Sequence, residues 1–546
     1  MKDLIPLDKY ATWKSEQLNV PVLRLTSHPR DYLSFGNLCE GVLALGQTGS
    51  GKSSALKTLA NALMSQGYGW FGLTAKPGDV IDQLQWAFDA DRIIYDEETG
   101  EVSGGVYILG SHPDDFTPYT ITGKDGKPLE LKIRDSQINF FEAEMSKPQS
   151  GQHGKYDPIE RILNVVMTVA AATAVLQRKS GSGGGDDFWV RTSNMLLNSL
   201  LTIIYSATQQ LDIGDIYKML ISLPKKPEDV TDGNSEWKNS YCAQFLKQHE
   251  TRLQLQSATE RNVKESISYC LSEFPAIAPQ TGSSIVAVLG SVLDNLRRDP
   301  LYTLMCSKKT TVAPETIRQG NIFICGLSIK THNELAQIAG ILYKRTFQRV
   351  LERTLVGRGA VIWADEAQNF LTPDDCGFQE TARSSRTIAI YITQNFPTLC
   401  KGMGGGDGGK QSAMALSGNL VNSLFFLNKD PETNNWAADI IGKDFRTIKN
   451  RGTSNTHMGG VSAGSSMSYN QQNEHILMPI TFTRLKSGTT LNKLLVEAVF
   501  YRCGHRFSNG KPFLKAVFHQ GHMGRMEKIE RFLRRILGMD DYVHGA

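Results

Sequence analysis

The chain has 546 residues, a length at which one hydrophobic core stops growing, so we expect two domains or one domain with a large insertion. Its 40% hydrophobic and 21% charged residues are typical of a globular protein, and a formal net charge of +4 is too small to indicate a nucleic-acid binder by itself. The eight cysteines include no C-x-x-C pair and no His/Cys cluster, which argues against a zinc site and a disulfide framework and favours a reducing cytoplasm.

The N-terminus and the apolar stretches also favour a cytoplasmic protein. Residues 1–6 lack the basic-then-apolar layout of a signal peptide. The longest apolar stretch, residues 162–176, is interrupted by Asn164 and Thr168 and is shorter than the ~20 residues needed to span a bilayer. We therefore expect it to form a buried helix.

The first predicted strand and helix enclose a phosphate-binding loop. Residues 42–45 form an apolar run, and residues 54–64 carry apolar side chains at helical spacing. Between them stands a complete G-x-x-x-x-G-K-[ST] motif, made of Gly46, Gln47, Thr48, Gly49, Ser50, Gly51, Lys52 and Ser53. In such a loop the glycines let backbone N–H groups converge on phosphates at the positive end of a helix.

This motif predicts ATP and Mg²⁺ as cofactors. We expect Lys52 to reach the β- and γ-phosphates and Ser53 to ligate Mg²⁺, with the nucleotide-binding segment extending through Ser54. The alternative is a glycine turn before a helix without a ligand, and the strand–loop–helix context argues against it.

The next elements are a strand and a hairpin. The strand, residues 69–74, is followed by Lys76 and Asp79, at the sheet edge where open α/β folds hold their ligands. Alternation around Asp125 and Gly126 predicts a surface hairpin over residues 120–133.

Strand signals fade between residues 156 and 312. Helical patterns such as residues 194–205 predominate there and indicate an all-helical insertion. The glycine-rich residues 181–185 are interpreted as a flexible linker and not as a second phosphate loop, because no Lys-Ser or Lys-Thr pair follows them.

The α/β pattern resumes with a strand at residues 321–325 and a long amphipathic helix at residues 332–354. Residues 360–364 and 388–392 are continuous apolar runs, the pattern of parallel strands buried on both faces. The predicted fold class is therefore α/β, a mostly parallel sheet with helices on both faces, interrupted by a large all-helical insertion. Two Gly- and Ser-rich stretches, residues 402–410 and 453–468, are predicted to be mobile loops.

Candidate catalytic residues lie at the ends of the last two strands. Asp365 and Glu366 close the first strand, where the Asp can hold Mg²⁺ and the Glu can polarise the attacking water. The alternative is an acidic strand end exposed to solvent. Gln394 ends the second strand, where its amide could sense the γ-phosphate or the water. Arg383 and Arg386 precede that strand, and either could stabilise transition-state charge or be a plain surface arginine.

Taken in order, these features resemble the coupling ATPases of bacterial conjugation and type IV secretion (TraG/TraD-like), within the FtsK/HerA group of P-loop DNA pumps. The resemblance extends from about residue 36 to about residue 520. The segments that support it, beyond the motifs above, are residues 138–140, 187–189, 317–324, 418–422 and 441–443.

The resemblance implies a RecA-like fold and a role for each matched residue. Lys52 and Ser53 match the family's phosphate and Mg²⁺ residues, Asp365 and Glu366 its second nucleotide motif, Arg383 its trans-acting arginine, and Gln394 its sensor glutamine. The interval of eleven residues to Gln394 favours Arg383 over Arg386.

The resemblance also implies a homo-hexameric ring around a DNA channel and a helical insertion that recognises accessory DNA-processing proteins. The nucleotide-binding domain is expected in two parts, residues 1–155 and 316–515. An all-alpha insertion, residues 156–315, lies between them, and a C-terminal helical tail covers residues 516–546.

The function expected from this family is ATP-driven translocation of DNA in a conjugation-like or mobile-element system. A viral genome-packaging ATPase and an ATP-switched adaptor for protein cargo stay as alternatives. Family members usually carry an N-terminal membrane anchor, and we expect none from this sequence. We therefore expect it either to dock on a separate membrane-channel protein at the inner membrane, or to move DNA without such a channel.

Contact with DNA is expected to be independent of sequence and to use dispersed basic residues. The candidates are Arg297, Arg298, Lys308, Lys309, Lys443, Arg446, Lys449 and Arg451. Each of them could equally be an ordinary solvated charge. The amphipathic pattern of residues 526–537 predicts a packing or subunit-contact helix, with a DNA- or membrane-surface helix as the alternative.

Overall fold

The structure is a computed structural model that describes residues 18–26, 28–110, 116–145, 158–179, 187–254, 260–307, 310–354, 356–456, 462–489 and 494–519. At its centre is an eleven-stranded sheet. In spatial order its strands are β17 (Phe513–His519), β16 (Leu495–Arg502), β13 (Asn422–Phe425), β3 (Val42–Leu45), β12 (Thr387–Thr393), β11 (Ala360–Ala364), β4 (Gly69–Leu73), β10 (Ile322–Cys325), β7 (Val106–Leu109), β9 (Pro128–Ser136) and β8 (Phe116–Thr122).

All neighbouring strands from β13 to β9 are parallel, and only β16, β17 and β8 join antiparallel. The predicted α/β class with a mostly parallel sheet is therefore confirmed. The predicted hairpin is β8 and β9, which belong to the edge of the main sheet.

Side chains of the parallel strands alternate between two cores, one on each face of the sheet. In β3, Val42 and Ala44 belong to one core and Leu43 and Leu45 to the other. This two-sided burial explains why these strands have continuous apolar sequences. Helices cover both faces, with α2 (Phe35–Cys39), α3 (Lys52–Ser65) and α4 (Pro77–Asp89) on one, and α14 (Ile329–Arg353), α15 (Asp374–Thr381), α16 (Phe396–Gly402), α17 (Gly406–Asn419) and α18 (Pro431–Ile441) on the other.

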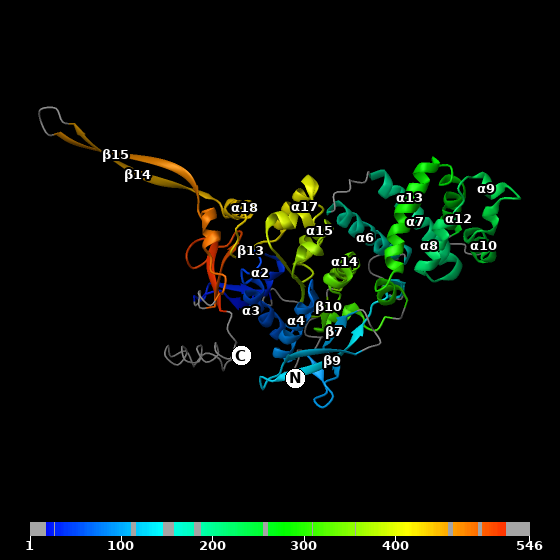
Figure 1. The fold of residues 1–546 in the computed structure, drawn as a ribbon, viewed down its shortest axis with the longest axis horizontal. Coiled ribbons are helices and arrows are strands. Elements are labelled where there is room, and N and C mark those ends of the chain that lie inside the picture. The colour runs from blue at the N-terminus through cyan, green and yellow to red at the C-terminus, as the bar shows by residue number, and fades with distance from the viewer. Residues whose placement is uncertain are drawn as a thin grey trace.

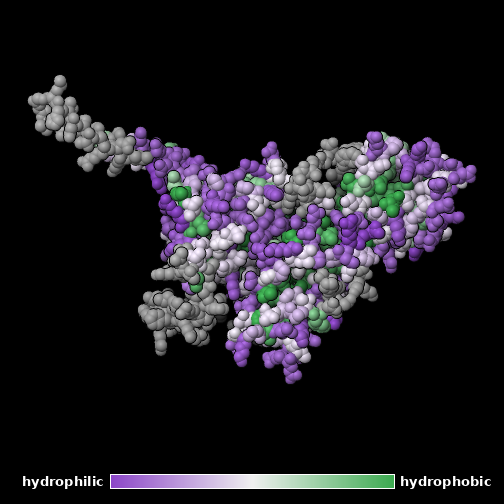
Figure 2. Space-filling model, viewed as in Figure 1, coloured by the Kyte–Doolittle hydropathy of each residue, from purple (hydrophilic) through white to green (hydrophobic). Residues whose placement is uncertain are grey.

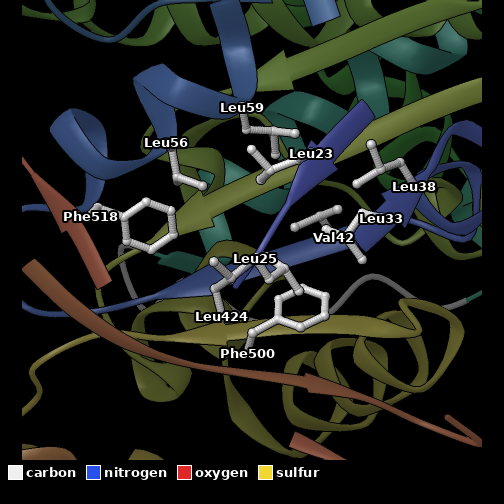
Figure 3. Close-up of a pocket in the computed structure, with 10 residues that line it drawn as sticks. All are labelled: Leu23, Leu25, Leu33, Leu38, Val42, Leu56, Leu59, Leu424, Phe500 and Phe518. Atoms are coloured by element: carbon white, nitrogen blue, oxygen red, sulfur yellow. The ribbon is translucent and has the colours of Figure 1, made fainter. Parts of the chain in front are cut away.

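The core on the α3 face is mostly apolar. Near β1 (Pro21–Arg24) and β2 (Tyr32–Ser34) it contains a small pocket lined only by leucine, valine and phenylalanine side chains (Figure 3). Because none of these side chains offers a hydrogen-bonding group, this pocket has no means to orient a polar ligand.

The chain between β9 and β10 is helical, with no strand among its described residues. Its elements are α5 (Phe140–Met145), α6 (Pro158–Lys179), α7 (Asp187–Thr208), α8 (Ile213–Ile221), α9 (Glu228–Thr231), η2 (Glu236–Asn239), α10 (Tyr241–Gln248), α11 (Glu250–Gln254), α12 (Glu260–Ser268), η3 (Tyr269–Glu273), α13 (Pro279–Arg297), η4 (Thr303–Ser307) and η5 (Pro314–Gln319). Figure 1 shows most of these helices gathered beside the sheet. The exact boundaries of the predicted domains remain a prediction.

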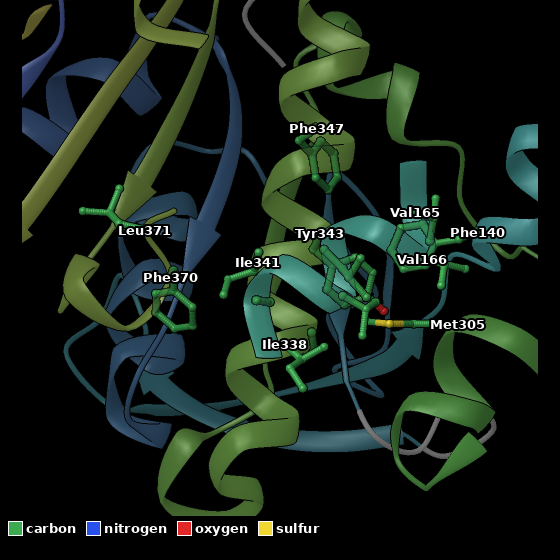
Figure 4. Packing of buried hydrophobic residues seen from close by; sticks show 14 of the residues in the cluster. Phe140, Val165, Val166, Met305, Ile338, Ile341, Tyr343, Phe347, Phe370 and Leu371 are labelled. Atoms are coloured by element: carbon green, nitrogen blue, oxygen red, sulfur yellow. The ribbon is translucent and has the colours of Figure 1, made fainter. Parts of the chain in front are cut away.

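Helix α14 connects the helical region to the sheet. The ring of Phe347 in α14 stacks on that of Phe71 in β4, with centroids 4.3 Å apart. The ring centroids of Tyr343 in α14 and Phe140 in α5 are 5.6 Å apart. In Figure 4, α6 places Val165 and Val166 beside Tyr343. The helical region therefore shares one continuous core with a face of the sheet. No helix in the described part of the chain is long and apolar enough to span a bilayer, including α6, which contains the predicted buried helix.

Two stretches differ from their prediction as mobile loops. Residues 406–410 begin helix α17, and residues 453–456 and 462–468 belong to strands β14 (Lys443–Thr456) and β15 (Ser462–His475). These strands pair over fourteen residues each into a separate hairpin that projects away from the rest of the molecule (Figure 1). A second separate pair joins β5 (Ile94–Tyr95) to β6 (Val102–Gly104). Residues 181–185, Lys308, Lys309 and residues 526–537 lie outside the described residues.

Candidate functional site

The phosphate loop lies between β3 and α3, as its motif predicts. Gly49 and Gly51 adopt positive φ angles of 76° and 82°, a conformation that favours glycine. The loop is fixed by its neighbours, because the Gly46 N–H donates to the Thr393 carbonyl at 3.3 Å and the Gln47 N–H to the Leu427 carbonyl at 3.0 Å. Helix α3 then begins at Lys52, so the N–H groups of its first turn face the loop.

Several groups of the loop fit a phosphate ligand. The Lys52 ammonium donates to the carbonyl oxygens of Gly46 and Gln47. Burial lowers the pKa of Lys52, although the charges of Asp365 and Glu366 act in the opposite direction. The buried Ser50 hydroxyl has no hydrogen-bond partner among the described residues. A half-buried cation and an unsatisfied hydroxyl at a helix N-terminus are the groups expected to bind an anion.

Asp365 and Glu366 follow β11, and β12 separates that strand from β3. The Ser53 hydroxyl donates to Asp365 Oδ2 at 3.3 Å. Burial, reinforced by the charge of Asp79, raises the pKa of Asp365 to about 6. A hydroxyl and a carboxylate at this distance are a donor set that Mg²⁺ accepts, and a bound cation would favour the ionised form of Asp365. No group of three or more His, Cys, Asp or Glu side chains that could hold a metal occurs in the described part of the chain.

Glu366 is held by three side chains from different segments. Its carboxylate accepts hydrogen bonds from Gln368 at 2.7 Å, Gln394 at 3.3 Å and Lys76 at 3.4 Å. Burial alone would raise the pKa of Glu366, but the hydrogen bond from Gln368 and the charges of Lys76 and Lys52 outweigh it and hold the pKa below its usual value. The carboxylate is therefore ionised, as a general base requires.

The backbone of Glu366 is also unusual. Its φ of 48° and ψ of 47° lie in the left-handed region, which a non-glycine residue rarely adopts. Such a conformation costs on the order of 1–3 kcal/mol and occurs most often at functional sites. Here it lets the chain turn sharply after β11, so that both Asp365 and Glu366 point to the loop side of the sheet edge.

The sequence did not predict that Lys76 and Gln368 contact Glu366. Lys76 could have been found from its position, because it follows β4, the neighbour of β11. Gln368 had none, since it lies in the short irregular helix η6 (Ala367–Asn369). Its side chain bridges two strands, accepting from the Thr393 hydroxyl at 2.8 Å while donating to Glu366.

Arg383 and Arg386 lie away from this cluster. Both precede β12, at the amino ends of the strands, whereas the phosphate loop and Gln394 lie at the carboxyl ends. The seven residues of β12 separate the two edges by roughly 20 Å. Arg383 is 61% exposed and pairs with Glu40 at 2.9 Å. Neither arginine can therefore contact the phosphate loop of its own chain.

Fold and site together define a P-loop protein of the RecA-like α/β class. Residues 360–487 match the family described as the TraM recognition site of TraD and TraG, a stretch that includes Asp365, Glu366, Arg383 and Gln394. The match confirms the resemblance to the TraG/TraD-like coupling ATPases that the sequence predicts. No curated protein sequence matches the chain.

Solved structures of the conjugative coupling protein TrwB share the fold. The unbound protein has a TM-score of 0.53 and 11% identity, over 92% of this chain and 89% of that one. The complex of TrwB with ADP and Mg²⁺ has a TM-score of 0.54 and 11% identity, over 93% of each chain. The complex with a non-hydrolysable GTP analogue has a TM-score of 0.54 and 12% identity, over 94% and 92%.

Proposed function

We propose that this protein is an ATP-driven, ring-forming DNA translocase of the conjugative coupling type. The observation that carries the proposal is the meeting of Lys52, Ser53, Asp365 and Glu366 at one sheet edge, with Gln394 within hydrogen-bond distance of Glu366. The match to the TraD and TraG family favours a conjugation-like system over the packaging of a viral genome. The structures of TrwB with ADP and Mg²⁺ support these two cofactors.

In this proposal the residues at the sheet edge divide the chemistry of ATP hydrolysis. Lys52 and the N–H groups at the start of α3 bind the phosphates, and Ser53 and Asp365 hold Mg²⁺. The ion, when bound, neutralises the negative charge of the phosphates. Glu366 orients the attacking water and accepts its proton, while Gln368 and Lys76 keep the carboxylate in position. Gln394 donates to Glu366, next to the place of the attacking water, which suits it to sense the state of the nucleotide.

Assembly completes the proposed mechanism. Because Arg383 lies at the opposite edge of the sheet from its own phosphate loop, it can serve only the loop of a neighbouring copy, as in a homo-hexameric ring. An arginine supplied by a neighbour can raise the rate by ~10³–10⁵. The helical region between β9 and β10 would meet an accessory DNA-processing protein, and a separate channel protein would hold the ring at the inner membrane.

The test is steady-state ATP hydrolysis with and without single- and double-stranded DNA at two salt concentrations. Lys52→Ala is the inactive reference, and Lys57→Ala, on the same helix, is its matched control. Stimulation by DNA that falls with salt is the expected result, because phosphate contacts release counterions. Hydrolysis that DNA does not change would instead favour an ATP-switched adaptor for protein cargo.

A further inference from the structure

The hairpin formed by β14 and β15 contributes no residue to the nucleotide site. It forms a two-stranded sheet of its own and extends about 45–50 Å from its base. The Ile476 N–H donates to the Gly442 carbonyl at 3.0 Å and closes that base. An isolated two-stranded hairpin is marginally stable in water, so a ligand is expected to contact it when it works.

The register of the hairpin divides its residues between two faces, because successive residues of a strand alternate. We call the first the Tyr469 face, which contains Phe445, Thr447, Lys449 and Arg451 of β14 and Met467, Tyr469, Gln471 and Asn473 of β15. We call the second the Arg446 face, which contains Asp444, Arg446 and Ile448 of β14 and Asn470, Gln472 and Glu474 of β15.

Three large apolar residues of the hairpin whose side chains the structure describes are exposed, and all three lie on the Tyr469 face. Phe445 is 68% exposed, Met467 60% and Tyr469 59%. Lys449 occupies the register position opposite Tyr469, and Arg451 the position opposite Met467. The face therefore interleaves aromatic and basic residue types over a length of roughly 20 Å from Phe445 to Arg451.

The acidic residues of the two strands are segregated onto the other face. Asp444 and Glu474 both lie on the Arg446 face, where Glu474 pairs with Arg446 at 3.4 Å. Hydrophilic residues predominate at the base of the hairpin in Figure 2. The Tyr469 face therefore has no acidic residue on either strand to repel a polyanion.

We propose that the Tyr469 face of this hairpin binds single-stranded DNA, with the bases stacked on Phe445 and Tyr469 and the phosphates bound by Lys449 and Arg451. Aromatic platforms alternating with cations are the means by which proteins hold single strands regardless of sequence. A duplex keeps its bases stacked on each other, so bulky exposed rings gain nothing from it. This proposal rests on the proposed function as a DNA translocase. It adds which element of the protein binds DNA, and that the DNA bound there is single-stranded.

The test is binding of a fluorescent oligothymidylate, and of a duplex of the same length, to the full chain by anisotropy over a range of salt concentrations. Tyr469→Ala is expected to weaken binding of the single strand about 5- to 100-fold, the loss of one stacked base, and to leave duplex binding unchanged. Arg451→Gln should lower the slope of log affinity against log salt by about 0.7, the loss of one phosphate contact.

Two variants of the Arg446 face are the matched controls. Arg446→Gln removes the same charge from the same strand, and Asn470→Ala truncates the residue next to Tyr469, which lies on the opposite face. Both should leave affinity for the single strand within about twofold of the wild type. All variants replace exposed or edge residues of the hairpin, and equal thermal unfolding midpoints would verify that they fold.

The outcomes separate this proposal from the proposed function. Equal affinities for all variants would overturn the hairpin proposal and leave a DNA motor that grips elsewhere. Smaller particles in light scattering for Tyr469→Ala, with unchanged affinity for DNA, would also overturn it and assign the face to a contact between copies. Binding through the Tyr469 face without any stimulation of ATP hydrolysis would support the hairpin proposal and overturn the DNA motor. Absence of DNA binding by the wild type would overturn both.

Discussion

At the scale of single residues, the site depends on how one carboxylate is held. Glu366 receives hydrogen bonds from Gln368, Gln394 and Lys76, which come from three separate segments of the chain. The sequence predicts Glu366 and Gln394 because each directly follows a recognisable strand. It could not predict Gln368, because an irregular turn has no periodicity that fixes where its side chains point.

Glu366→Gln is expected to keep ATP binding while hydrolysis falls by ~10²–10⁴-fold, the usual contribution of a general base. The neutral amide has nearly the same shape but cannot accept the proton from water. Single-turnover hydrolysis and equilibrium nucleotide binding, measured together, check this. Glu334→Gln, on the exposed side of α14, is the control. A Glu366→Gln protein that loses binding yet hydrolyses normally when saturated would contradict the role.

Gln368→Met is expected to lower kcat about 10- to 100-fold with a smaller change in KM, because it releases the carboxylate that Gln368 positions. The substitution also leaves the Thr393 hydroxyl without its acceptor at 2.8 Å. Steady-state kinetics against ATP measures the effect, with Gln254→Met on the distant helix α11 as the control. An unchanged kcat would show that Gln394 and Lys76 suffice to hold Glu366.

At the scale of elements, a buried ion pair connects Lys344 of α14 to Asp375 of α15, which follows Asp365 and Glu366 in the chain. The Lys344 ammonium donates to Asp375 and to the Phe370 carbonyl, and Asp375 also accepts from Gln348 and from the Thr372 N–H. Lys344 and Asp375 are almost completely buried. Burial lowers the pKa of Lys344, and the charge of Asp375 opposes this shift.

Lys344→Met is expected to destabilise the protein by ~3–5 kcal/mol, because it leaves the Asp375 carboxylate buried without its cation. Thermal or urea unfolding measures the loss. Lys330→Met, on the exposed first turn of the same helix, should change little. Equal stability of the two variants would mean that Gln348 and the Thr372 N–H alone compensate the buried charge.

The elements that the sequence predicts wrongly share a physical cause. Helix α17 contains three glycines in its first turn, and its stability comes from packing: Ala413 and Leu416 are buried, and a Cβ on Gly409 would meet the Cys400 carbonyl at 2.7 Å. The glycine allows that close approach and at the same time removes the helical signal. The strands β14 and β15 belong to no layered core, so no apolar alternation marks them. The parallel strands were predictable because burial on both faces gives a continuous apolar run.

At the scale of the whole molecule, Arg383 and the phosphate loop of one chain lie at opposite edges of the sheet. Mixtures of inactive Arg383→Ala and inactive Lys52→Ala subunits are therefore expected to regain hydrolysis, because some interfaces combine an intact loop with an intact arginine. ATP hydrolysis across a series of mixing ratios measures this recovery. Glu40→Gln is the control, since it weakens the ion pairs of Glu40 with Arg383 and Arg502 but keeps both arginines, and an unchanged unfolding midpoint would verify that it folds. Mixtures inactive at every ratio, or a Glu40→Gln protein as inactive as Arg383→Ala, would contradict a role between subunits.

The path of the chain through the helical region has a consequence for how such proteins could be re-engineered. β9 and β10 run in the same direction, so the chain leaves the sheet at the carboxyl end of β9 and returns to it at the amino end of β10. The helical region is therefore an enlarged version of the single helix that normally links two parallel strands. Helix α6 of this region lies beside α14, which follows β10, whereas α7 to α12 continue the same core farther from the sheet (Figure 1). Under the proposed function, chimaeras that exchange residues 187–273, and keep the apolar side chains of α7 that pack in this core, should preserve ATP hydrolysis while changing the partner that the protein recognises.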